Sequence, residues 1–266
     1  MSKHYKILVL TDLKDSPSTL LNNAVNLAKK VDGEIDLFSV QKFTDVVERE
    51  SQLSAMRTLN EKYNAFEKDI KNTVEPISKA CDIKINYQFS FGNVKDEIKN
   101  YISQQQPDVI VLGKKKKAFS VVGDRIANYV LKQHKGTVLI VPSKSTLEPN
   151  QELSLGLLQD SGDTVNNAFV KNLFEKNTQP LKSFKLVDGE MHSTTSNALF
   201  NSKVIEYVFD KSDNAISNLS NYLTKSNVNL LYFNKEETRS DNSSKSSSMF
   251  NAERLINNLN VSLLIA

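Results

Sequence analysis

The sequence has little of what a disulfide framework or a metal centre requires. It holds one cysteine, Cys81, which excludes an intrachain disulfide. Its three histidines, His4, His134 and His192, are scattered without the spacing of a metal site. We therefore expect neither a disulfide nor a bound metal, and we interpret Cys81 as a small packed residue.

Long apolar runs and an excess of one charge are also missing. The sequence has no run of about 18 apolar residues and no charged-then-apolar opening segment, which argues against a membrane-spanning helix and a secretory signal. A cytoplasmic location is then the expectation. The net charge of +3 comes from 34 basic and 31 acidic residues, a balance that disfavours attraction to membranes or nucleic acid.

Apolar strands and amphipathic helices alternate through residue 142. The expected strands are 5–12, 35–40, 83–89, 108–112 and 138–141. Helices are expected at about 17–30, at 46–80 with an interruption near Pro76, after Gly92-Asn93, and after Gly123. Parallel neighbours need crossover connections, so the alternation predicts a parallel sheet wrapped by helices.

The same order of elements begins again after a polar segment that contains Pro149. Asn166-Asn167-Ala168 repeats Asn22-Asn23-Ala24, and apolar segments recur at 153–160, 204–209, 229–233 and 261–265. We interpret this as a tandem duplication with a first domain at 1–144, a linker at 145–152 and a second domain at 153–266. The second copy is shortened, because 190–203 leaves room for little more than a turn where the first copy has a long helix.

One stretch, 108–142, has the layout of a nucleotide site. Asp108 to Leu112 is typical of a buried strand and Gly113 of the turn that ends it. A phosphate-cradling loop needs small residues so that backbone N–H groups can approach the anion, whereas this sequence has four lysines, Lys114 to Lys117. These lysines are either an anion-binding feature or a solvated charge cluster.

Together these segments resemble the universal stress proteins in their tandem-domain form. The resemblance rests on Ile7-Leu-Val-Leu-Thr-Asp12, the 35–40 strand, Phe91-Gly92-Asn93 and 108–142, and in the second half on element order alone. It implies an α/β, Rossmann-like fold of two tandem open parallel five-stranded sheets flanked by helices. Members of the family commonly dimerise through the last strand.

Dimerisation through the last strand, together with the apolar character of both terminal strands, predicts an intrachain pseudo-dimer. We expect 261–265 to pair with 138–141, since either strand would otherwise be an exposed apolar edge. A further homodimer of the whole chain stays open.

Some members of the family bind ATP, and the resemblance carries their residues onto matching positions here. Thr11 and Asp12 match the end of the first strand near the adenosine, and Val40 matches the backbone position that meets the base. Leu112 and Gly113 match the start of the family's glycine motif.

The rest of that motif is changed. Lys116 stands where the second glycine belongs, and Gly123-Asp124 stands where the motif has Gly-Ser or Gly-Thr. Lys116 adds a side chain where backbone should approach the ligand, and Asp124 puts a carboxylate where a phosphate would lie. The lysines supply charge but no backbone cradle, and Mg²⁺ is expected only if ATP is bound.

In the second half the equivalent site is altered further. Asp160 is retained, but Phe233-Asn234-Lys235-Glu236-Glu237 replaces the glycine start and the serine-rich loop Ser240–Ser248 replaces the phosphate loop. We expect no nucleotide there, and we interpret the serine loop as a surface loop.

The sequence favours a stress-response protein that acts by binding unknown protein partners, with a degenerate adenine-nucleotide site in its first domain. The alternative is an ATP-binding switch with slow hydrolysis. No catalytic triad is recognisable, and Asp12 to Ser16 does not supply the Ser-Gly-Gly loop of adenylating enzymes, so we expect at most a weak ATPase. Asp12 itself stays open between a ligand contact and a turn cap.

Overall fold

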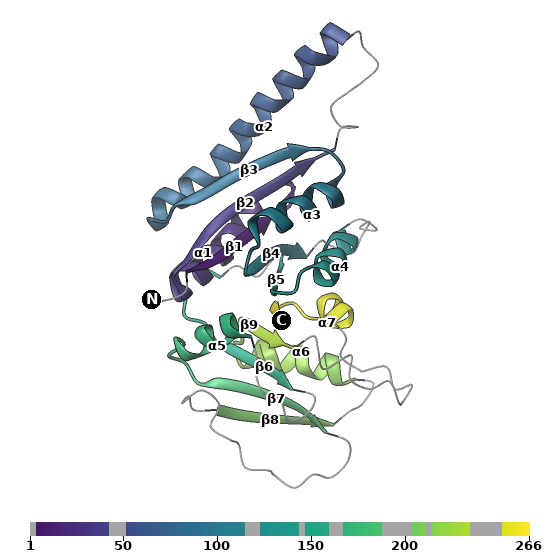
Figure 1. Cartoon of the computed structure of the whole chain (residues 1–266). Helices are drawn as coiled ribbons and strands as arrows, with labels where there is room; N and C mark the ends of the chain where they lie inside the picture. The colour runs from purple at the N-terminus through teal and green to yellow at the C-terminus, as the bar shows by residue number, and fades with distance from the viewer. Residues whose placement is uncertain are drawn as a thin grey trace.

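The computed structural model describes residues 4–42, 52–114, 123–143, 147–159, 167–187, 204–210, 214–234 and 252–266. Strands and helices alternate along the described chain, except that β6 follows β5 and β8 follows β7 directly (Figure 1). The strands are β1 (Tyr5–Leu10), β2 (Gly33–Gln41), β3 (Ile85–Phe91), β4 (Val109–Lys114), β5 (Thr137–Pro142), β6 (Leu155–Gln159), β7 (Leu181–Val187), β8 (Val204–Asp210), β9 (Leu230–Phe233) and β10 (Ser262–Ile265). The helices are α1 (Pro17–Val31), α2 (Gln52–Cys81), α3 (Val94–Gln105), α4 (Gly123–Gln133), α5 (Ala168–Glu175), α6 (Ala215–Lys225) and α7 (Ala252–Asn258).

The strands form one ten-stranded sheet in the order β3-β2-β1-β4-β5-β10-β9-β6-β7-β8. Each half contributes five parallel strands, and the two halves repeat the same internal order. The predicted α/β fold with two parallel five-stranded sheets is therefore confirmed.

The two halves meet where β5 and β10 pair antiparallel. Leu263 lies opposite Ile140, Leu264 opposite Leu139, and Ile265 opposite Val138. All six side chains are buried. The predicted pairing of the terminal strands is confirmed, and it turns two apolar edges into the middle of a continuous sheet.

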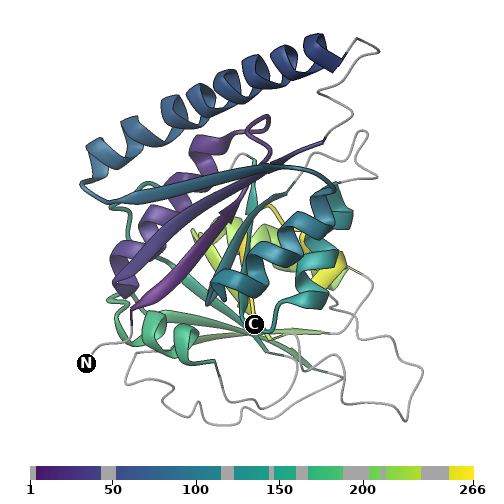
Figure 2. The same cartoon turned by 45° about the horizontal axis from the view of Figure 1, so that its top comes forward.

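Two apolar cores cover the two faces of the sheet. One lies beneath α1, α2 and α5, and the other lies beneath α3, α4, α6 and α7 (Figures 1 and 2). Both cores contain residues from both halves, since each continues across the seam formed by β5 and β10. The seam is thus part of each core and not a thin contact between two separate units.

Asparagine starts one helix in each half. The Asn93 side chain accepts a hydrogen bond from the backbone N–H of Lys95 at the start of α3, and Asn167 accepts from Phe169 and Val170 at the start of α5. Such caps satisfy N–H groups that the first helical turn leaves without a partner.

The helix α2 differs from its prediction. It runs through Pro76 without a break, so the expected interruption there was wrong. Ile70 and Val74 are fully or almost fully buried against the sheet, and their packing offsets the roughly 3 kcal/mol that an interior proline costs. At about 1.5 Å per residue the helix is about 45 Å long, twice the length of β3, and it extends beyond the strands it covers (Figure 2).

The polar segment between the halves is held against α1. The side-chain amide of Asn26 donates to the carbonyl oxygens of Glu148 (2.6 Å) and Gln151 (2.9 Å), and Leu147 is buried. Asn26 itself is fully buried in the middle of α1. The described part of this segment, from Leu147, is therefore a packed element of the fold.

Candidate functional site

A cavity of about 390 Å³ opens at the carboxyl ends of β1, β2, β4 and β5. It is lined by Leu10, Thr11, Asp12, Lys14, Asp15, Ser16, Thr19, Leu20, Phe38, Val40, Gln41, Lys42, Val94, Ile98, Leu112, Gly113, Lys114, Ile126, Ala127, Val141, Pro142 and Ser143. The order of strands in the first half reverses between β1 and β4, and ligands of open α/β sheets bind at such a switch point. Five of the eight predicted site residues line this cavity: Thr11, Asp12, Val40, Leu112 and Gly113.

The loop after β1 is fixed by its own side chains. The Thr11 hydroxyl accepts from the backbone N–H of Leu13 (3.0 Å), and the Asp12 carboxylate accepts from that of Lys14 (3.0 Å). Leu13 and Ser16 take left-handed backbone conformations, with φ of 61° and 49°, which cost energy in residues other than glycine. Asp12 is therefore a turn cap as well as a residue of the cavity wall.

Val40 directs its backbone towards the cavity. In a strand, the N–H and C=O of one residue point to the same side, and those of the next residue point to the other side. The Phe38 carbonyl accepts from Thr11 on the β1 side, and that of Gln41 accepts from Gly92 on the β3 side. Val40 shares the side of Phe38, beyond the last β1–β2 pair at Leu10, so its polar edge faces the cavity.

Gly113 lies inside β4, opposite Val141, and not in a turn. The prediction that Gly113 ends the strand was wrong, because pairing with β5 continues to Lys114 and Pro142. Among the described residues, the atoms nearest to a methyl group at Gly113 would be those of Leu20, at 3.5 Å, which is ordinary contact. The protein itself therefore does not require glycine at this position.

The other predicted site residues lie at the start of α4 or outside the described residues. Gly123 and Asp124 are the first two residues of α4, and Ile126 and Ala127 in the same turn line the cavity. An acidic residue in the first turn of a helix is favourable for the helix but unfavourable for an anion bound there. Lys116 lies outside the described residues.

Lys114, the first of the four lysines, has a partner that the sequence did not indicate. Its ammonium group donates to the backbone carbonyl oxygens of Leu259 (2.8 Å) and Asn257 (3.4 Å), at the end of α7 in the second half. Lys114 also lines the cavity. No local pattern could have revealed this contact, since the two partners lie more than 140 residues apart in the chain.

The back wall of the cavity is apolar. The ring of Phe38 stacks on Tyr101, with centroids 4.0 Å apart and planes 8° apart. Burial, with a smaller contribution from Asp36, raises the pKa of Tyr101 to about 12. The rim is charged, with Asp12, Asp15, Lys14, Lys42 and Lys114. A flat apolar wall beside a charged rim suits a ligand with an aromatic part and a polar part.

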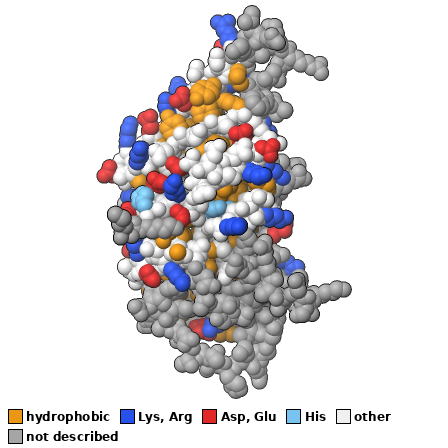
Figure 3. All heavy atoms as spheres, in the orientation of Figure 1, with side chains coloured by type: hydrophobic (Ala, Val, Ile, Leu, Met, Phe, Trp, Pro, Cys, Tyr) orange, Lys and Arg blue, Asp and Glu red, His pale blue; other side chains and the backbone are white. Residues whose placement is uncertain are grey.

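Outside the cavity the described surface offers few alternatives. Basic and acidic side chains are intermixed on the face shown in Figure 3. Within the described residues, no group of three or more His, Cys, Asp or Glu side chains could hold a metal ion. No helix among them is long and apolar enough to cross a membrane. Cys81 is a half-buried free thiol.

The register shows which residues of the second half correspond to the site. Leu10 pairs with both Phe38 and Leu112, and Leu158 pairs with both Phe184 and Phe233 in the same way. Asn234 therefore takes the position of Gly113, as the sequence indicated. Asp160 and the serine loop Ser240–Ser248 lie outside the described residues.

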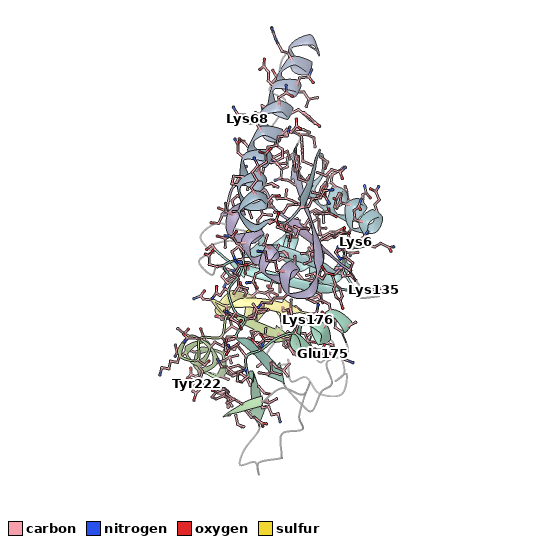
Figure 4. All side chains as sticks on the ribbon, turned by 90° about the vertical axis from the view of Figure 1, so that its left-hand side faces the viewer. Lys6, Lys68, Lys135, Glu175, Lys176 and Tyr222 are labelled. Atoms are coloured by element: carbon pink, nitrogen blue, oxygen red, sulfur yellow. The ribbon has the colours of Figure 1, made fainter. Side chains whose placement is uncertain are left out.

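Aromatic rings fill the α6 side of the second half. Phe184 stacks on Tyr207, with centroids 5.3 Å apart, and Tyr222 on α6 contacts Tyr207 and Phe209 edge-on at 5.0 and 5.4 Å. Tyr222, labelled in Figure 4, lies on the outer side of this cluster and is 41% exposed. These contacts make the cluster a packing feature of α6 and the edge strands.

Comparison with known proteins places the chain in a family. The sequence pattern of the Universal stress protein family matches residues 4–142. The chain is similar in structure to a universal stress protein from Archaeoglobus fulgidus DSM 4304, with 14% identity, a TM-score of 0.63, and coverage of 98% of this chain and 96% of that one.

Two further solved structures are similar. A functionally unknown protein from Pseudomonas aeruginosa PAO1 has 10% identity and a TM-score of 0.58, covering 99% of this chain and 92% of that one. A universal stress protein solved in complex with cAMP has 17% identity and a TM-score of 0.37, covering 53% of this chain and 100% of that one. A search of curated proteins found no match. Since the family pattern spans more than half of the sequence, the chain belongs to the universal stress protein family.

Proposed function

We propose that the chain is a cytoplasmic stress-response protein that binds an adenine nucleotide reversibly in its first half and acts through protein partners. The observation that supports this most directly is the convergence of five predicted residues, from the ends of three strands, on one cavity at the switch point of the sheet. Chemistry on the nucleotide is not the main role in this proposal.

The cavity offers different surroundings for the parts of a nucleotide. The base would lie against the apolar wall at Phe38, with its hydrogen-bonding edge towards the backbone of Val40. The ribose would lie near Asp12. The phosphates would extend towards the start of α4, where Asp124 opposes them by about 1–3 kcal/mol at an effective dielectric constant of about 20. Nucleotides with fewer phosphates should therefore lose less affinity than ATP.

We also propose that the two halves arose by duplication, with the divisions 1–144, 145–152 and 153–266. The support is the identical strand order and the matching register around Leu10 and Leu158. In this proposal the chain is a pseudo-dimer whose second nucleotide site has been lost.

The test is calorimetric titration of the purified chain with ATP, AMP, cAMP and adenosine, with and without Mg²⁺. Mass spectrometry of the denatured protein would detect nucleotide that is retained through purification. Binding of any adenine compound at micromolar to millimolar concentration supports the proposal, and no heat at millimolar ligand refutes it. ADP formed from bound ATP would favour the alternative of a hydrolysing switch.

Two variants of Asp12 separate its two roles. Asp12→Asn keeps the side-chain oxygen that accepts from Lys14, so the melting temperature should stay the same while the affinity for adenine ligands falls. Asp12→Ala removes the cap as well and should cost about 1 kcal/mol of stability. If Asp12→Asn binds as tightly as the wild type, the carboxylate is a cap only.

A further inference from the structure

Lys114 lines the cavity in the first half and also forms hydrogen bonds to the second half. It is the last residue of β4 and lines the cavity, while its ammonium group is bonded to the end of α7. Among the charged residues of the rim, Lys114 is the one for which the described contacts include a bond to the second half. The nucleotide pocket and the C-terminal part of the chain thus share one cation.

The carboxyl end of α7 is stabilised by a nearby cation. The last carbonyl groups of a helix have no partner within the helix and together carry about half a negative charge. Leu259, one of the two acceptors, is buried, and Ser262 begins the seam strand β10 three residues later. The Lys114 ammonium therefore stabilises the helix end that leads directly into the seam.

We propose that the position of the Lys114 ammonium group depends on the charge of the ligand, and that an anionic ligand draws this group away from α7. The inference rests on the proposed function. A nucleotide phosphate carries between one and two negative charges, more than the roughly half charge of a helix end, so a phosphate within reach of the flexible lysine wins the competition. Adenosine has no such charge and leaves the contact with α7 in place.

The other lysines of the rim provide the comparison. Lys14 and Lys42 line the same cavity from the loops after β1 and β2, on the side away from α7. If a general attraction between the rim and an anion explained the response of α7, Lys14 and Lys42 would produce that response as well as Lys114 does. They would not connect the ligand to the second half.

The experiment is hydrogen–deuterium exchange of the full chain, read on peptides that cover α7 and β10. The protein is measured alone and with saturating adenosine, AMP or ATP, with saturation confirmed by calorimetry. We expect about tenfold faster exchange in α7 with AMP or ATP, and no change with adenosine. Lys114→Met should show the faster exchange without ligand, respond no further to AMP, and bind AMP more weakly relative to adenosine than the wild type does. Lys42→Met, at the same rim, should weaken AMP binding but, once saturated with AMP, still show the faster exchange in α7.

The outcomes separate this inference from the proposed function. If AMP binds but α7 exchanges as before, the coupling is refuted while the nucleotide site stands. If Lys114→Met has the same ratio of AMP affinity to adenosine affinity as the wild type, another group responds to the ligand charge and the inference is likewise refuted. If no adenine compound binds, the proposed function itself fails. The wild-type ligand series needs no variant, so the test holds even if Lys114→Met folds poorly.

Discussion

The seam between the two halves can be tested by removing one side chain, with Leu264→Ala. Leu264 is fully buried in β10, opposite Leu139 of the first half and beside Tyr232 of the second. All three belong to the core beneath α1 and α5. Truncating a buried leucine costs about 2–5 kcal/mol, through lost burial and the cavity that remains. Rigid strands of both halves surround Leu264 and limit how far the cavity can close. We therefore expect the free energy of unfolding to fall by about 3 kcal/mol or more.

Urea unfolding followed by far-UV circular dichroism measures this loss. With a slope of about 3 kcal/mol per molar urea, the midpoint should fall by about 1 M. Native-state hydrogen exchange should show that β1 and β4 lose protection together with β9 and β10, because both cores cross the seam. Val208→Ala, on the 55% exposed side chain of the edge strand β8, is the control and should change stability by less than about 0.5 kcal/mol.

The reasoning would be refuted by a loss below about 1 kcal/mol for Leu264→Ala, since a fully buried leucine in a rigid core does not cost so little. It would also be refuted if the second half lost protection while the first half kept it. That result would mean that the halves unfold as independent domains joined by a weak edge contact.

Four further predictions concern the site and the chain end. Gly113→Ala should leave stability within about 0.5 kcal/mol, because the new methyl lies nearest to Leu20, at 3.5 Å, but should weaken AMP binding about tenfold in calorimetry; unchanged affinity would place the ligand elsewhere. Asp124→Ser should tighten ATP binding by about 5- to 150-fold, which corresponds to about 1–3 kcal/mol, whereas Glu253→Ser, at the second residue of the counterpart helix α7, should not. Deleting residues from Val261 onward should expose β5 and cause aggregation in size-exclusion chromatography, and a soluble chain with an unchanged melting temperature would contradict this. The pKa of Tyr101 is about 12 in the fold and 10.0 ordinarily, so its contribution to the free energy of unfolding is fully present below pH 10.0 and is lost as the pH rises towards 12. Tyr101→Phe should reduce this alkaline loss of stability in melting curves.

The architecture of the chain could be predicted from the sequence because its strands are buried on both faces. Such strands appear as continuous apolar runs, and the helices between them show a separate helical period. The seam followed from the same reasoning, since two apolar edge strands need a partner and 138–141 and 261–265 supply one for each other. The parts of the site that lie at strand ends, such as Thr11 and Leu112, were expected from the resemblance to the universal stress proteins, and both line the cavity.

What the sequence did not reveal depends on contacts between distant segments. Gly113 continues the strand because Val141 lies beside it, although glycine between an apolar run and a charged run usually marks a turn. Lys114 is partly buried and bonds to the end of α7, a partner that lies far away in the sequence. Pro76 stays inside α2 because Val74 before it and Ile77 after it both pack against the core. In each case tertiary packing outweighed a local preference.

The two halves differ on the face of the sheet that lies beneath α2 in the first half. In the first half, Tyr87 and Phe89 of β3 pack beneath α2, and Phe89 touches Phe66 at 5.1 Å. The same register positions in β8 hold Glu206 and Val208, and Glu206 forms an ion pair with Lys185 at 3.0 Å.

This difference follows from what a covering helix would cost or protect. A helix packed over the pair of Glu206 and Lys185 would remove two charges from water, a cost that their attraction does not reliably repay. Conversely, an aromatic face like that of Tyr87 and Phe89 would be a large exposed apolar patch without its helix. The pair of Glu206 and Lys185 therefore suits a partly exposed face of the sheet, and Val208, which is 55% exposed, takes the position that Phe89 holds beneath α2.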